Sequence, residues 1–231
     1  MAIWNQSCLR GMTGNRERTR RSINEYLQFG MRRMKKKEES GTLAGKPQER
    51  GHKRREVRLA GFGGQGIVLA GNILGKAIVL HEGKNAVFTQ SYGPEARGGA
   101  CSADVVLSHE PIHYPKVSEP DVLVFLSEEA RTTYGSQLDP GTVVIYDSDL
   151  VKGKELEGRV DHLFSVPATR FAEDLGRKMV ANIVTLGFLA AVTDIVQGES
   201  LKKAVLSSVP KGTEELNASA FEKGYEYGQE K

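Results

Sequence analysis

The sequence has little cysteine, and the two cysteines that it has lie far apart. Cys8 and Cys101 are the only ones in 231 residues, so they form neither a C-x-x-C metal pair nor a disulfide framework. This usage is typical of a reducing compartment, and we expect a cytoplasmic protein. An iron–sulfur cluster needs about four thiolates, which excludes a cluster held by this chain alone.

Long apolar runs are also missing. A membrane-spanning helix needs roughly 18 or more apolar residues in succession. The nearest candidate, residues 183–196, is interrupted by Thr185 and Asp194 and predicts a buried core helix instead. We therefore expect no membrane partner. The hydrophobic fraction of 39% still suffices for the core of one large domain or two small ones.

The side chains that usually carry catalysis form no recognisable group. His109 and His113 are four residues apart, which would place them on one face of a helix. Pro111 lies between them and disfavours a helix there, so we do not predict a metal site from this pair. Cys101 follows two glycines at a strand start, which favours a small buried thiol over a nucleophile. The Gly-Asp-Gly…Asn motif that holds thiamine diphosphate and its metal is absent. The sequence therefore predicts no catalytic residue and no metal site in this chain.

Charge is distributed very unevenly. Residues 1–55 hold 15 Lys and Arg against 5 Asp and Glu, whereas the remainder holds 17 against 24. The basic leader is poor in apolar residues and cannot bury enough surface to fold alone. We therefore divide the chain into a basic, disordered extension over residues 1–54 and a folded domain over residues 55–231.

Three roles for this leader stay open. A nucleic-acid tail would explain the charge, but aromatic residues are not interleaved with it, and we expect no nucleic-acid partner. An Arg-rich organellar transit peptide is a second option, against which Glu17 and Glu25 count. The favoured reading is an extension from a start placed too far upstream, with Met31 and Met34 as later starts.

The folded domain opens with a strand, a glycine turn and a helix. Val57 and Leu59 alternate in the first strand, and four glycines follow before an apolar helical run over residues 67–80. These are Gly61, Gly63, Gly64 and Gly66, with Gln65 among them. Such a turn opens a doubly wound α/β unit, and the first helical N–H groups would face a phosphate or carboxylate. The alternative is a tight turn that merely packs a helix on a sheet.

The remaining pattern alternates strands with helices. We expect strands over 56–60, 85–89, 103–108, 121–126, 142–146 and 161–166, and helices over 67–80, 128–137, 167–178, 182–196, 201–207 and 214–227. This alternation predicts an α/β fold with a doubly wound, largely parallel, Rossmann-like sheet and a C-terminal helical segment.

The spacing Gly61-x-Gly63-x-x-Gly66 also fits the fingerprint of dinucleotide-binding proteins, but an NAD site requires an acidic residue as well. An NAD-binding unit places Asp or Glu at the end of its second strand, about 20 residues beyond the glycines. Here that strand ends in Thr89-Gln90-Ser91; Glu82 comes too early and Glu95 lies inside a later glycine loop. The missing acid argues against a nicotinamide cofactor.

Two stretches together resemble the gamma subunit of 2-oxoacid:ferredoxin oxidoreductases. They are residues 58–67, Arg-Leu-Ala-Gly-Phe-Gly-Gly-Gln-Gly-Ile, and residues 90–99, Gln-Ser-Tyr-Gly-Pro-Glu-Ala-Arg-Gly-Gly. The second is more similar to the 2-oxoglutarate branch than to the pyruvate branch. Residues 180–187, Val-Ala-Asn-Ile-Val-Thr-Leu-Gly, resemble the family's Asn-containing helix start. The resemblance covers roughly residues 55–230.

This resemblance implies a role inside a complex. Alpha and beta subunits would hold thiamine diphosphate and Mg²⁺ between them, and a ferredoxin-like delta subunit would carry iron–sulfur clusters. The complex would decarboxylate a 2-oxoacid, which the 2-oxoglutarate branch implies to be 2-oxoglutarate, leave acyl-CoA and pass electrons to ferredoxin. This chain would hold no cofactor alone, but it resembles a lid that contacts CoA. The competing class is a stand-alone nucleotide-binding regulator.

The second glycine stretch supplies the remaining candidate site residues, which are Tyr92, Arg97, Gly98 and Gly99. In a doubly wound sheet, the end of the second strand lies on the same carboxyl edge as the first glycine turn. A phosphate-bearing molecule such as CoA, or a charged group of a partner, would then touch both stretches. The alternative is that Arg97 pairs with Glu95 or another carboxylate and only rigidifies the loop.

Overall fold

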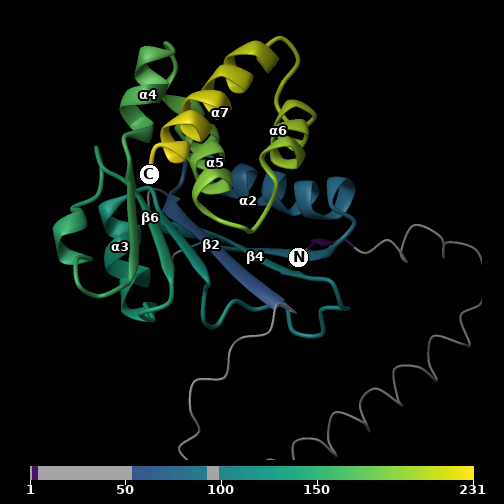
Figure 1. Ribbon diagram of the computed structural model, residues 1–231, viewed down its shortest axis with the longest axis vertical. Helices are drawn as coiled ribbons and strands as arrows, with labels where there is room; N and C mark the ends of the chain where they lie inside the picture. Colours follow the sequence, from purple (N-terminus) through teal and green to yellow (C-terminus); the bar gives the residue numbers. More distant parts are fainter. Residues whose placement is uncertain (1, 5–53, 93–98) are drawn as a thin grey trace, which may run out of the picture. The chain divides into compact units, whose positions relative to one another are not determined.

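A computed structural model of the chain describes residues 2–4, 54–92 and 99–231. The strands among these residues form one sheet in the order β1-β3-β4-β2-β5-β6-β7 (Figure 1). Their bounds are β1 Ala2–Trp4, β2 Arg54–Phe62, β3 Asn85–Tyr92, β4 Ala100–Ser108, β5 Val122–Phe125, β6 Val143–Asp147 and β7 His162–Val166.

The sheet is mixed but mostly runs in one direction. Strands β2, β5, β6 and β7 pair in parallel. Strand β4 is antiparallel to both β2 and β3, so β3 points the same way as β2. The predicted α/β class and largely parallel sheet are confirmed. Strand β4 runs the other way because the link over residues 93–99 is too short for a parallel crossover, which takes a dozen residues or more.

Helices follow the strands and then accumulate at the C-terminal end. The α-helices are α2 Ile67–Lys76, α3 Glu128–Tyr134, α4 Ala168–Asp174, α5 Ala181–Val192, α6 Gly198–Leu206 and α7 Glu214–Gln229. A π-helical turn, η2 Ala77–His81, extends α2, and a 3₁₀ turn, η5 Lys178–Val180, leads into α5. Figure 1 shows α2, α5, α6 and α7 gathered on one side of the sheet. The C-terminal helical segment is thus confirmed.

Side-chain alternation along the strands creates a core on each face of the sheet. In β5, Val122 and Val124 pack into the larger core with α2, α5 and α7. Leu123 and Phe125 point the other way, into a smaller core with Ala130 of α3. Strand β5 is therefore apolar on both faces, as a covered parallel strand requires.

Strand β2 is less uniform, because it buries a charge. Arg58 lies directly opposite Asp104 of β4, and two of its nitrogens lie 2.8 Å from the two carboxylate oxygens. The guanidinium also lies 5.3 Å from the ring centroid of Tyr134. Removing one partner of such a buried pair typically costs about 3–5 kcal/mol, so this cross-strand pair fixes the register of β2 against β4.

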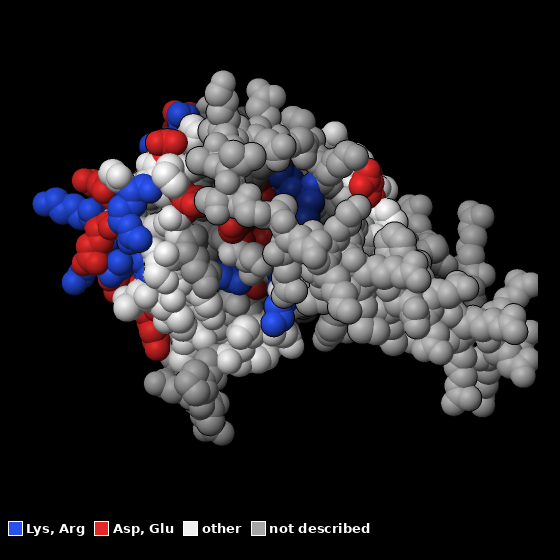
Figure 2. Space-filling model, turned by 90° about the horizontal axis from the view of Figure 1, so that it is seen from below, with Lys and Arg blue, Asp and Glu red and all other residues white. Residues whose placement is uncertain are grey.

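Exposed charges are mixed in sign. In Figure 2, blue Lys and Arg side chains lie among red Asp and Glu side chains at the left of the visible face. Ion pairs such as those of Lys178 with Glu173 at 2.6 Å and of Lys223 with Asp174 at 3.0 Å are of this kind. Such exposed pairs contribute little stability, about 0–1 kcal/mol each. The charges drawn on this face therefore do not form a block of one sign.

One short piece of the leader belongs to the sheet. Residues Ala2–Trp4 form β1 and pair antiparallel with β3, with Ile3 opposite Val87. Arg54 is the first residue of β2. The other residues of the predicted disordered extension over residues 1–54 lie outside the described part, and for them the expectation stays a prediction.

Candidate functional site

The predicted glycine turn lies at the carboxyl end of β2. Strand β2 ends at Phe62, and α2 begins at Ile67 with Gly66 as its N-cap. Gly64 and Gly66 have φ values of +104° and +73°, a region that side chains other than glycine rarely adopt. No side chain caps the start of α2. Its first N–H groups are therefore in place to bind an anion.

Gln65 ties this turn to the neighbouring strand. The Phe62 N–H donates to Gln65 Oε1 at 2.9 Å, and Gln65 Nε2 donates to the carbonyl of Leu126 at 2.6 Å. Leu126 directly follows β5. Because both ends of the amide are bonded to backbone, this side chain supports the turn. A direct contact of Gln65 with a ligand stays a prediction.

Asn182 holds the turn from the opposite side. Its Nδ2 donates to the Gly66 carbonyl at 3.1 Å across 116 positions of sequence. A Cβ on Gly66 would overlap the Asn182 side chain, and a Cβ on Gly61 would come within 2.6 Å of Ile67. Gly61 and Gly66 are thus required by packing as well as by any ligand, whereas Gly63 and Gly64 border open space.

The second glycine stretch reaches the same edge. Tyr92 ends β3 with its side chain exposed, and Gly99 immediately precedes β4. Ala100 of β4 is opposite Phe62, so Gly99 lies close to the first turn in the sheet. Strand β4 lies between β2 and β3, so the backbone of Tyr92 lies two strand spacings, about 10 Å, from the end of β2. Arg97 and Gly98 lie outside the described residues.

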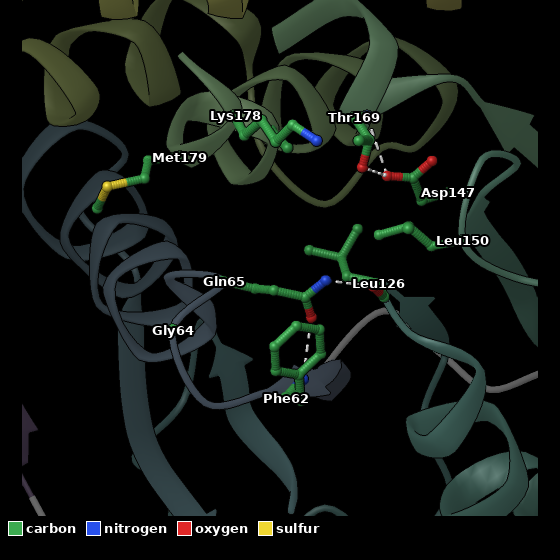
Figure 3. Close-up of a pocket in the computed structure, with 10 residues that line it drawn as sticks. Phe62, Gly64, Gln65, Leu126, Asp147, Leu150, Thr169, Lys178 and Met179 are labelled. Carbon is green, nitrogen blue, oxygen red and sulfur yellow. Dashed lines mark hydrogen bonds between the residues drawn. The ribbon is translucent and has the colours of Figure 1, made fainter. Parts of the chain in front are cut away.

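A pocket of about 360 Å³ opens at this edge. Its lining residues come from the ends of β2, β5 and β6 and from the starts of α4 and α5 (Figure 3): Phe62, Gly64, Gln65, Leu126, Asp147, Leu150, Thr169, Lys178, Met179 and Ala181. The walls are mainly apolar, and Phe62, Leu150 and Met179 are among the exposed large apolar side chains. An elongated, partly apolar molecule with an anionic group fits this combination.

Lys178 supplies a positive charge at the mouth of this pocket. Figure 3 shows its ammonium pointing across the pocket towards Thr169. It forms an exposed ion pair with Glu173 at 2.6 Å, and such a pair is weak enough to be exchanged for a ligand. Sequence reasoning missed Lys178, since nothing in its local pattern distinguishes it from other surface lysines.

Asp147 is the buried acid of the pocket. It ends β6 and accepts hydrogen bonds from the Thr169 hydroxyl at 2.6 Å, the Thr169 N–H at 3.0 Å and the Asp149 N–H at 2.9 Å. Burial raises the pKa of Asp147, although these hydrogen bonds oppose the shift. The carboxylate thus holds the first turn of α4 against β6 and shapes one wall. Its place at a strand end was the sequence signal that could have identified it.

The remaining titratable candidates lie elsewhere. Burial raises the pKa of the Cys101 thiol, which disfavours the reactive thiolate. Among the described residues, no group of His, Cys, Asp and Glu side chains could hold a metal ion. No helix in the described part of the chain is long and apolar enough to cross a bilayer.

This geometry defines the class of protein. A doubly wound α/β domain with a glycine turn, uncapped helix starts and a pocket at the carboxyl edge of its sheet is a domain of the Rossmann-like class, in which this edge is the usual place for a ligand.

Comparison with known proteins gives the family. Residues 56–227 match the family described as pyruvate ferredoxin/flavodoxin oxidoreductase. The 2-oxoglutarate synthase subunit KorC of Methanocaldococcus jannaschii is 53% identical over 178 residues, which cover 77% of this chain and 95% of that relative. KorC of Methanothermobacter marburgensis is 49% identical, covering 75% of this chain and 96% of the relative. The chain belongs to the pyruvate ferredoxin/flavodoxin oxidoreductase family.

Solved structures agree with this assignment. The gamma subunit of a keto/oxoacid ferredoxin oxidoreductase from Geobacter sulfurreducens is 41% identical, with a TM-score of 0.69 over 76% of this chain and 96% of that one. The 2-oxoglutarate:ferredoxin oxidoreductase from Magnetococcus marinus, solved with 2-oxoglutarate, coenzyme A and succinyl-CoA, shares the fold at 23% identity and a TM-score of 0.67, covering 78% of this chain and 32% of that chain. The predicted gamma-subunit resemblance and its 2-oxoglutarate branch are confirmed.

Proposed function

We propose that this chain is the gamma subunit of a thiamine-dependent 2-oxoglutarate:ferredoxin oxidoreductase and that its edge pocket contacts CoA. The net reaction of such a complex releases carbon dioxide from 2-oxoglutarate, transfers the succinyl group to the CoA sulfur and passes the released electrons to ferredoxin. The observation that carries the assignment is the 53% identity with a 2-oxoglutarate synthase subunit, which extends over 95% of that relative.

Within that complex, this chain contributes binding. The N–H groups at the start of α2 and the Lys178 ammonium favour a phosphate, and the apolar walls suit the uncharged arm of CoA. Alpha and beta subunits would hold thiamine diphosphate and Mg²⁺, and a ferredoxin-like delta subunit would hold the iron–sulfur clusters. The relatives' subunit names support the presence of further subunits, and the distribution of the cofactors among those subunits is our proposal.

The stand-alone nucleotide-binding regulator is the weaker alternative. Strand β3 ends in Thr89, Gln90, Ser91 and Tyr92, so no acid is present at the position that would hold the ribose hydroxyls of NAD. Purification of the native chain decides between the two. Co-purifying subunits that reduce ferredoxin with 2-oxoglutarate and CoA support the proposal, whereas a partnerless chain that binds a nucleotide refutes it.

Two substitutions in the assembled complex test the CoA contact. Arg97→Ala removes the charged hydrogen-bond donor that the second glycine stretch predicts for a phosphate. Such a donor is worth roughly 1.5–3 kcal/mol, so the KM for CoA should rise by about ten- to a hundredfold. Lys178→Gln removes an exposed charge and should raise it by about three- to tenfold. The KM for 2-oxoglutarate and the thiamine content should stay unchanged.

Lys211→Gln serves as the matched control for Lys178→Gln. Lys211 is an exposed lysine between α6 and α7 and does not line the pocket, so its loss should leave the KM for CoA unchanged. If Arg97→Ala instead dissociates the complex on gel filtration with an unaltered CoA dependence, Arg97 is an interface residue and its cofactor role is wrong.

A further inference from the structure

Asn182 combines deep burial with an incomplete set of hydrogen bonds. It is the second residue of α5 and is 3% exposed. Its Nδ2 donates to Gly66, but its buried Oδ1 has no hydrogen-bond partner within the described part of the chain. Leaving such an acceptor unpaired destabilises the folded chain. An apolar residue would avoid this cost, so the amide needs an explanation beyond stability.

The position of Asn182 gives that explanation. Its amide is in contact with Gly66, whose positive φ and lack of Cβ leave room for it. Gln65 fixes the other side of the turn to Leu126. The turn is therefore held between α5 and β5, and its conformation does not depend on a bound molecule.

The two longest helices at the pocket begin at this point. Helix α2 starts after Gly66 and α5 starts at Ala181, and neither has a side-chain cap. The hydrogen bond from Asn182 to Gly66 is the link between the two starts. The Gly66 carbonyl also accepts the first intrahelical bond of α2, from the Ala70 N–H at 2.9 Å. Loss of the Asn182 donor would therefore remove the hydrogen bond that anchors this first turn to α5.

We infer that Asn182 is a positioning residue: its amide donor anchors the Gly66 carbonyl, and with it the first turn of α2, to the start of α5, so that the N–H groups at the start of α2 face the phosphate of the bound molecule. Asn182 acts through the turn and does not touch the reacting atoms. This inference rests on the proposed contact between the edge pocket and CoA.

Asn182→Asp in the assembled complex is the most informative change. It keeps the shape of the side chain but replaces the donor with a carboxylate, which repels both the Gly66 carbonyl and a phosphate. At neutral pH we expect the KM for CoA to rise at least tenfold, with an unchanged KM for 2-oxoglutarate. As the pH falls, the introduced carboxylic acid regains a proton to donate, and the KM should return towards that of the wild type at the same pH.

Asn182→Ala has no donor at any pH, so its KM for CoA should be raised without this recovery. It also carries the test if the aspartate variant does not assemble. The wild type, measured over the same pH range, corrects for the pH dependence that Asp147 and the other charged groups of the pocket contribute. A merely structural role predicts a lower melting temperature with no pH-dependent change in KM.

Asn217→Asp is the matched control. Asn217 is also buried in a helix, where its Nδ2 bonds to Thr213 at 2.8 Å, far from the pocket. The Asn217→Asp variant should leave the KM for CoA unchanged. If Arg97→Ala and Lys178→Gln raise that KM while both Asn182 variants leave it unaltered, the positioning role is wrong. If none of the four raises it, the CoA contact itself is wrong, and the inference fails with it.

Discussion

The contact between α5 and α7 makes a sharp prediction about stability. The two helices approach so closely that their backbones touch at glycines. A Cβ on Gly224 would fall on the carbonyl oxygen of Val184 and lie 3.1 Å from the nitrogen of Phe188, and a Cβ on Gly187 would meet the backbone of Phe221 and Tyr225. Backbone atoms of a packed helix cannot rotate aside, so Gly224→Ala must push the helices apart.

The size of the effect follows from two opposing terms. Alanine gains about 1 kcal/mol over glycine inside a helix. Overpacking costs up to about 3 kcal/mol, and the rigid backbone places this site at the upper end. The net loss of about 2 kcal/mol should lower the melting temperature by roughly 4–8 °C for a domain of this size.

Gly75→Ala provides the matched control. Gly75 is a buried glycine inside α2, but a Cβ there would meet only the Cβ of Phe88 at 3.9 Å, an ordinary contact. We expect a rise in melting temperature of about 1–4 °C from helix propensity. Thermal unfolding of both full-length variants, followed by circular dichroism, makes the comparison. If Gly224→Ala stabilises the chain as Gly75→Ala does, the close contact of α5 with α7 is refuted.

Three further predictions concern pH, the leader and nucleotides. Burial raises the folded-state pKa of Asp147 above its ordinary 3.8. Between 3.8 and the raised pKa, the folded chain binds more protons than the unfolded chain. The contribution of Asp147 to stability therefore falls as the pH rises through that window. Urea unfolding across this range should show that slope in the wild type and a smaller one in Asp147→Asn; equal slopes would contradict it. Of the residues that the structure describes, a chain that begins at Arg54 loses only the three paired residues of β1, and it should fold and assemble as well as the full chain; a drop of several degrees in melting temperature would show that the leader stabilises the domain. The isolated chain should show no oxidoreductase activity and no useful affinity for NAD, and micromolar binding of NAD or NADP by calorimetry would overturn the argument from the missing acid after β3.

Much of the fold could be predicted because its signals are local. The alternation of Val57 with Leu59 predicted β2, and the continuous apolar run of β5 predicted a strand covered on both faces. The glycines between β2 and α2 predicted the turn and its place at the carboxyl edge. The direction of β4 could also have been predicted, since a connection over residues 93–99 is too short for a parallel crossover.

The pocket was harder to predict, because tertiary packing brings its walls together. Lys178 and Met179 reach Phe62 across more than 100 positions of sequence, and no periodicity relates them. Asn182 did carry a signal, as a lone amide in an otherwise apolar helix, but its hydrogen bond to Gly66 depends on how α5 docks. The roles of Tyr92, Arg97, Gly98 and Gly99 stay predictions.

The glycine contact between α5 and α7 also has a consequence for synthesis of the chain. Helix α7 occupies residues 214–229 and leaves the ribosome after α5 and the other described elements. Until it docks, Val184 and Phe188 of α5 have no covering layer on that side, and their apolar surface is open to other nascent chains and chaperones. A message that ends before residue 214 would therefore yield an aggregation-prone product, although it encodes the whole sheet and the whole pocket.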